Sequence, residues 1–172
     1  MVELKNKYQI GKRRFGVINW VGAYSLYKKE VLRFITVAGQ TLIGPVVTSV
    51  LFLLVISLAI GEDRENVLGV PFIEFLAPGL ISMQVIQQSF SHSSSSLLMG
   101  KVMGNIVDLI GSPLSASEVT LSIIFASITR GILISIISFF VFSLMIELEI
   151  KNYLILLTYL ILNGFLMGAI GF

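Results

Sequence analysis

The sequence predicts an all-α membrane protein, and two observations support this fold class. Four long stretches of the 172 residues contain no Asp, Glu, Lys or Arg: 40–61, 75–100, 131–146 and 152–172. Hydrophobic residues make up 55% of the chain and charged residues only 13%, with a mean hydropathy of +0.92. An apolar helix of about 20 residues crosses the roughly 30 Å hydrocarbon core of a bilayer. We therefore expect four transmembrane helices.

The chain begins with two segments that precede the first span. Residues 1–16 are polar and basic and predict a cytosolic tail. Residues 17–36 predict an amphipathic helix lying in the membrane interface. Its expected apolar stripe is Trp20, Tyr24, Tyr27, Val31 and Phe34, and Ser25, Lys29 and Arg33 follow another face.

The four predicted spans cover 41–60, 72–90, 119–145 and 153–172. Pro45 falls in the first turn of the first span, where proline is tolerated. Pro78 and Gly79 interrupt the second span, because proline removes a backbone hydrogen bond and glycine admits a neighbouring helix. We expect a kink or break there.

Two further features mark the later spans. Arg130 lies inside the third span, where a charge is costly and is expected to face protein, water or the interface. Gly164 and Gly168 in the fourth span form a pair suited to close helix packing. His92 is the one histidine, and its serine-rich surroundings at 89–96 predict a polar exit from the second span, at the membrane interface.

The connection at 97–118 predicts a short amphipathic helix. Val102, Ile106 and Leu109 share a stripe at helical spacing, and Asn105 and Asp108 point elsewhere. A Gly-Ser-Pro sequence at 111–113 ends that helix. Ser115 and Glu118 then stand at the spacing of a capping box, which predicts the start of the third span.

The placement of basic residues predicts the orientation. Eight of the twelve Lys and Arg residues precede the first span. The positive-inside rule then places the N-terminus and the 91–118 connection in the cytosol, and the 61–71 and 147–152 loops outside.

Several classes of chemistry are not expected. The chain has no cysteine and one histidine, so we expect no protein-only zinc site. Neither Gly-Lys pair, at 11–12 or at 100–101, has a glycine five residues before it, so no P-loop is present. The serine run at 89–96 has no nucleophile motif. We expect no catalytic residue, no cofactor, no metal, no nucleic-acid partner and no enzymatic activity.

Four short motifs together resemble a known family. They are the Tyr-Lys-Lys-Glu sequence at 27–30, Phe-Leu-Ala-Pro-Gly-Leu at 75–80, the segment at 105–114 that ends in Ser-Pro-Leu, and the Arg-Gly pair at 130–131. In this order and spacing they resemble the membrane subunit of an ABC-2 type transporter, the permease class of many bacterial exporters. The resemblance covers almost the whole chain.

The resemblance implies a function. Such a subunit is a multi-pass protein of the bacterial plasma membrane that dimerises, as a homodimer or heterodimer, and docks on cytosolic ATPase subunits. The cytosolic segment would pass ATP-driven closure of the ATPases to the spans. Its expected coupling residues are Val102, Asn105, Ile106, Asp108, Leu109, Ser112 and Pro113.

One departure and one alternative stay open. The family usually has six spans and this chain has four, so we expect a single, incomplete ABC-2 transmembrane domain over 1–172. The alternative is a small four-span membrane protein of another class, such as a channel or an assembly factor. A channel requires polar residues along a span face, whereas the first and fourth spans are uniformly apolar.

Overall fold

Every named element of the structure is a helix, which confirms the predicted class. The computed structural model describes residues 18–60, 67, 69–146 and 152–172. The elements are α1 (Trp20–Thr36), a π-helical turn η2 (Gly39–Ile43), α2 (Gly44–Ile60), α3 (Phe72–Val102), α4 (Ile106–Ile110), α5 (Ala116–Ser143) and α6 (Tyr153–Gly171). The predicted tail at 1–16, most of the 61–71 loop and the 147–151 loop lie outside the described residues.

Three helical stretches are long and apolar enough to cross a membrane. They are Gly39–Ala59, Ala116–Ser143 and Tyr153–Gly171, and they correspond to the first, third and fourth predicted spans. The second predicted span, 72–90, lies within α3. This helix is long enough, but Glu74 and glutamines 84, 87 and 88 lower its hydropathy.

The helix that contains the second predicted span continues past residue 90. Residues 89–96, expected as a polar exit, are fully helical, and α3 continues to Val102. The serines fit a helix here because their hydroxyls bond to backbone carbonyls, as Ser95 does to the carbonyl of His92 at 3.0 Å. Gly104 then turns the chain with a φ of +72°, a value that favours glycine.

The helix does not break at Pro78, and the expected close approach at Gly79 needs correction. The helix passes through Pro78 without a break, and the carbonyl of Pro78 accepts a hydrogen bond from Ser82. Gly79 is exposed, and no described atom other than its own helix lies within 4 Å of a Cβ built there. The close approach of α3 to α5 occurs instead at Gly131, where an added Cβ would lie 2.7 Å from the Ser89 hydroxyl oxygen.

Side chains adjacent in sequence cap three of the helices, one of them as predicted. The side chain of Asn19 caps α1 by accepting from the amide of Gly22 at 3.0 Å. Ser115 and Glu118 form the predicted capping box at the start of α5. Asn152 caps α6. These caps satisfy amides that have no partner within their own helices.

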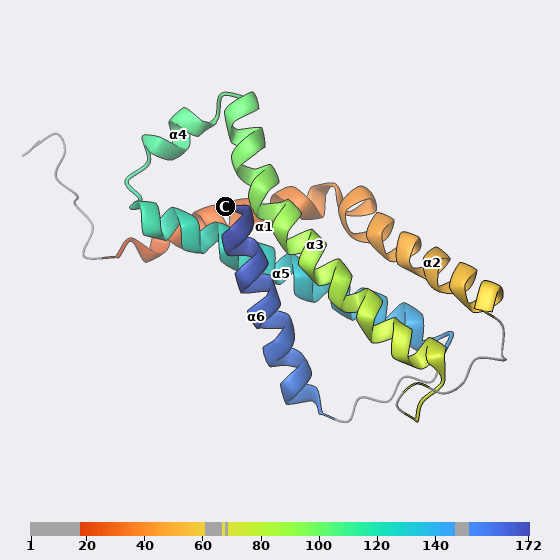
Figure 1. The fold of residues 1–172 in the computed structure, drawn as a ribbon. Coiled ribbons are helices and arrows are strands. Elements are labelled where there is room, and N and C mark those ends of the chain that lie inside the picture. The colour runs from red at the N-terminus through yellow and green to blue at the C-terminus, as the bar shows by residue number, and fades with distance from the viewer. Residues whose placement is uncertain (1–17, 61–66, 68, 147–151) are drawn as a thin grey trace, which may run out of the picture.

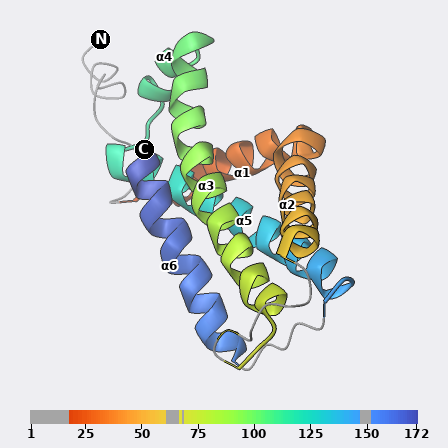
Figure 2. The ribbon, with the colours of Figure 1, turned by 45° about the vertical axis from the view of Figure 1, so that its right-hand side comes forward.

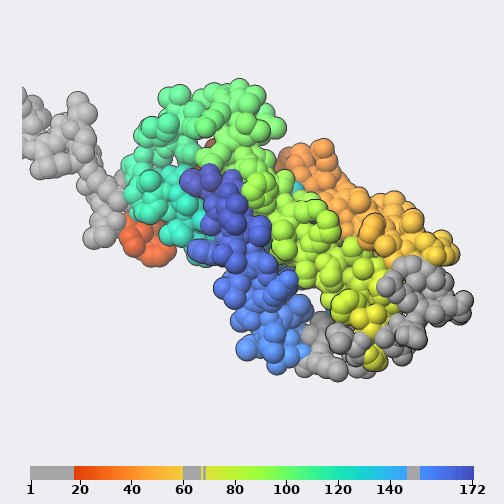
Figure 3. All heavy atoms as spheres, viewed as in Figure 1, coloured from red at the N-terminus to blue at the C-terminus, as the bar shows by residue number. Residues whose placement is uncertain are grey.

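The helices α3, α5 and α6 form the packed centre of the molecule (Figures 1 and 2). Gly164 and Gly168 of α6 lie against Ile128 and Ser127 of α5, which confirms the predicted close-packing pair. In the space-filling view, α6 lies across α5 and beside α3 (Figure 3). An apolar cluster joins α2 to the centre through Leu53, Ala77, Leu80, Ile81 and Phe142.

The helix α1 packs along the first half of α5. Its buried residues are Leu26, Glu30 and Phe34, which follow one another at four-residue spacing. Trp20 and Tyr24 of the predicted apolar stripe are exposed, whereas Phe34 of the same stripe is buried. The sequence did not indicate that Leu26 and Glu30 would join Phe34 on the face that packs.

Candidate functional site

The structure places the predicted coupling residues on both sides of Gly104. Val102 ends α3, and Ile106, Asp108 and Leu109 belong to α4, so the predicted continuous stripe does not exist as one helix face. Two groups differ in exposure. Val102, Asn105, Asp108 and Pro113 are exposed, and Ile106, Leu109 and Ser112 are half-buried.

The outward face of α4 carries apolar residues that the sequence reasoning missed. Val107 is 70% exposed and Ile110 is 77% exposed, with the exposed Asp108 between them in sequence. Ile106 and Leu109 face the opposite way. The spacing of three residues between Val107 and Ile110 is a helical signal, but a five-residue helix with apolar residues on both faces does not reveal which face is covered.

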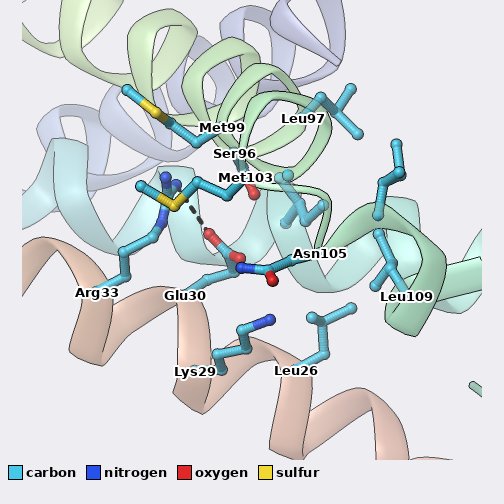
Figure 4. Close-up of a pocket in the computed structure, with 13 residues that line it drawn as sticks. Leu26, Lys29, Glu30, Arg33, Ser96, Leu97, Met99, Met103, Asn105 and Leu109 are labelled. Carbon is cyan, nitrogen blue, oxygen red and sulfur yellow. Dashed lines mark ion pairs between the residues drawn. The ribbon is translucent and has the colours of Figure 1, made fainter.

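A cavity of about 100 Å³ lies behind α4, between α1 and the end of α3 (Figure 4). Ile106 and Leu109 line it from α4, and Met99 and Met103 line it from the end of α3 and the turn that follows. Its polar wall is formed by Lys29, Glu30, Arg33, Ser96 and Asn105. The inward face of α4 thus meets α1 and α3 across this cavity, which leaves the outward face available to another molecule.

An ion pair stands at the inner wall of the cavity. Arg33 Nη2 lies 2.9 Å from Glu30 Oε2, one helical turn away (Figure 4). The same guanidinium donates to the backbone carbonyl of His92 at 3.5 Å. His92 is fully buried, with its ring edge-on to Phe34 and its Nε2 3.8 Å from Glu30 Oε2. Side chains of α1 thus cover His92, which the sequence alone did not indicate.

A line of polar side chains continues from the cavity along α3. We call it the polar seam: Gln84, Gln88, His92 and Ser96, spaced by four residues. Residues four apart share one face of a helix. That face packs against α2 and α5, and side chains of α1 contact it at His92. The seam therefore connects the cavity behind α4 with the interior of the helix bundle.

The deeper residues of the seam bond to α5 and α2. Arg130 of α5 is only 7% exposed and donates to the side-chain oxygen of Gln88 and, at 3.5 Å, to the carbonyl of Thr41. This confirms that Arg130 faces protein. Gln84 donates to the Ser49 hydroxyl and accepts from the Ser138 hydroxyl at 2.6 Å.

Several buried polar atoms near the seam make no hydrogen bond within the described part of the chain. They are Arg33 Nε, Arg130 Nε, the Ser93 hydroxyl and both ring nitrogens of His92. A buried donor or acceptor without a hydrogen bond destabilises a packed interior, because it has lost its bonds to water.

Comparison with known proteins decides the family. Residues 22–172 match the ABC-2 type transporter family. The chain belongs to this family. It is also similar to the inner membrane transport permease YadH of Escherichia coli K12 and of Shigella flexneri, with 26% identity over 152 residues in each case. The match covers 88% of this chain and 59% of the relatives, so the chain spans less than two thirds of their length. No solved structure gave a significant match.

Proposed function

We propose that this ABC-2 family chain forms the membrane-spanning path of an exporter of the bacterial inner membrane and couples to a separate cytosolic ATPase. A second permease subunit, identical or related, completes the path. The N-terminus and α4 face the cytosol. Family membership and the likeness to inner membrane transport permeases support the class, and the charge distribution supports the orientation.

The observation that carries the coupling proposal is the two-sided helix α4. Its exposed residues Val107 and Ile110 offer an apolar contact with the carboxylate of Asp108 beside them. Burial of these two side chains in an interface would remove apolar surface from water, which favours association. The ATPase therefore contacts the outward face, rather than the stripe of Ile106 and Leu109 that the sequence alone suggested.

The inward face of α4 and the polar seam could transmit a movement of α4 to the transmembrane helices. A push on α4 acts on Ile106 and Leu109, across the cavity from Glu30 and Arg33 of α1. From there the polar seam reaches α5 through Arg130 and α2 through Ser49. A partner that moves α4 thus changes contacts in several transmembrane helices at once.

The alternative of a channel or an assembly factor predicts a different partner. We infer an ATPase partner because the chain belongs to the ABC-2 type transporter family. A gene with a Walker A motif beside the gene for this chain supports the ATPase, and its product is the partner to use in the experiment.

The experiment replaces the outward face of α4. The double variant Val107→Asp with Ile110→Asp should reach the membrane but fail to co-purify with the ATPase, because two carboxylates would be buried without partners. Substrate-stimulated ATP hydrolysis should fall to the level of the ATPase alone. The control is Ser117→Asp, an exposed position in the first turn of α5 where an acidic residue is tolerated.

A second variant distinguishes docking from folding. Ile106→Asp with Leu109→Asp changes the inward face and should give a poorly folded or aggregated protein on size-exclusion chromatography. If the Val107 and Ile110 variant instead keeps an intact complex with normal ATP hydrolysis, α4 is not the coupling element. If both double variants behave like Ser117→Asp, the two faces of α4 do not differ.

A further inference from the structure

A second cavity lies between α1 and α5, on the side of α1 that faces away from α4. Its volume is about 670 Å³, within the roughly 300–1,000 Å³ typical of small-molecule sites. Trp20, Ala23, Tyr24 and Tyr27 line it from α1, and Leu121 and Phe125 line it from α5. We call it the aromatic groove. Its α1 wall contains three residues of the predicted apolar stripe, Trp20, Tyr24 and Tyr27.

The polar atoms along the groove already have partners in the protein. The hydroxyl groups of Tyr27 and Thr129 are 2.9 Å apart. The Ser122 hydroxyl bonds to the carbonyl of Ala23 at 3.0 Å. The carboxylate of Glu118 accepts from the backbone amides of Asn19 and Ser115 at 2.6 and 2.8 Å. The groove therefore presents mainly hydrocarbon and ring surface to an occupant.

The position of the groove decides between possible apolar occupants. Leu121 and Phe125 are exposed on α5, a helix long and apolar enough to span a membrane. Trp20 is 74% exposed and Tyr24 is 65% exposed. Tryptophan and tyrosine concentrate where a protein meets the level of the lipid headgroups. The surroundings of this groove are thus the edge of one leaflet, where the abundant apolar molecule is lipid.

We propose that the aromatic groove binds one acyl chain of a membrane phospholipid from the leaflet on the side of α4. The chain lies along Ala23 and Ser122 on the floor, between the rings of Tyr24 and Phe125. The headgroup stays near the first turns of α1 and α5. A bound acyl chain in this groove would hold α1 against α5, next to the cavity behind α4.

The test uses Trp20, which is the one tryptophan in the chain. Bromine atoms on a lipid acyl chain quench tryptophan fluorescence on contact. The purified chain in detergent is titrated with a phosphatidylcholine brominated on the acyl-chain carbons nearest the headgroup, because Trp20 lies in the first turn of α1, where the headgroup is placed. The groove predicts quenching that saturates at about one lipid per chain, whereas simple mixing of lipid into the micelle gives no saturation.

Variants tie the quenching to the groove. Ala23→Leu fills the floor and should lose most of the saturable quenching. Ala169→Leu makes the same change at an exposed position of α6 and should keep it. Phe125→Ala removes an aromatic ring that lines the groove and should also weaken the saturable quenching. This variant provides the test if Ala23→Leu does not purify as a single species.

Three results would overturn the proposal. One is quenching that rises without saturation in the unmodified chain. Another is saturable quenching that is identical in Ala23→Leu, Phe125→Ala and Ala169→Leu. The third is an absence of quenching, together with Trp20→Cys chains that cross-link to one another, because a second copy of this chain would then cover the groove.

Discussion

The helices α5 and α2 are both apolar enough to span a membrane, yet they are packed very differently. In the most apolar 18-residue window of each helix, 56% of the residues are buried in α5 but only 17% in α2. The corresponding share in α6, the third such helix, is also 17%. The helix α5 carries Arg130, Ser127 and Ser138, each of which bonds to α3 or lies against a glycine of α6. The most apolar helix is thus not the most buried one.

This difference follows from the solvent. In a bilayer, lipid tails are as apolar as leucine, so apolar side chains gain little by leaving them. Hydrogen bonds and close backbone contacts decide which helices associate. The helix α3 lacks the hydropathy of the other spans because of its glutamines, but those same residues connect it to α2 and α5.

The largest effect is expected where a buried charge loses its acceptor. Gln88→Leu removes the closer acceptor of the Arg130 guanidinium and leaves the carbonyl of Thr41, at 3.5 Å. We expect the free energy of unfolding to fall by about 2–3 kcal/mol, measured by denaturant titration of the purified protein in detergent.

The neighbouring residue provides the control for this variant. Gln87 is exposed, and Gln87→Leu makes the same chemical change one position away on α3. We expect a change within about 0.5 kcal/mol. Equal losses in the two variants would mean that the bond between Arg130 and Gln88 contributes nothing to stability.

A smaller effect is expected at the glycine contact of α6. Gly168→Val would place a Cβ against the Ser127 hydroxyl, so α6 must move away from α5. We expect a loss of about 1–2 kcal/mol in the free energy of unfolding. Ala169→Val on the exposed side of the same helix should have almost no effect. If Ala169→Val is the more damaging change, α6 packs through its other face.

The smallest effect is expected on the exposed faces of α2 and α6. Leu58 is 83% exposed and Leu154 is also exposed. Leu58→Ala and Leu154→Ala should each change the free energy of unfolding by less than about 0.5 kcal/mol, because lipid surrounds both side chains before and after the change. A loss above 1 kcal/mol at either position, within the about 1–3 kcal/mol expected of a buried site, would show that protein covers that face, as a second permease subunit would.

The sequence predicted the positions of the helices well, but it predicted poorly which face of each helix packs against its neighbours. Uncharged runs located α2, α5 and α6, and the capping box of Ser115 and Glu118 located the start of α5. Gly164 and Gly168 indicated a close contact that the structure contains. These signals are local, because hydropathy, caps and small residues act over one or two helical turns.

The candidate site was only half predicted. The sequence located the segment around α4 and singled out Arg130, but it did not show that Ile106 and Leu109 are half-buried, and it missed the polar seam. Gln84, Gln88 and His92 were readable as an i, i+4 series. The sequence did not show what this series contacts, because a polar stripe on a membrane helix can face a pore, a neighbouring helix or the interface.

The sequence by itself determined that this chain spans a membrane, where most of its helices begin and end, and which family it resembles. The tertiary structure alone decided that Leu26, Glu30 and Phe34 form the buried face of α1, and that α3 is held through its polar residues. The physical reason is that hydropathy describes contact with the solvent, one residue at a time. Burial of Arg130 and His92 depends instead on partners that are distant in sequence and meet only when the helices pack.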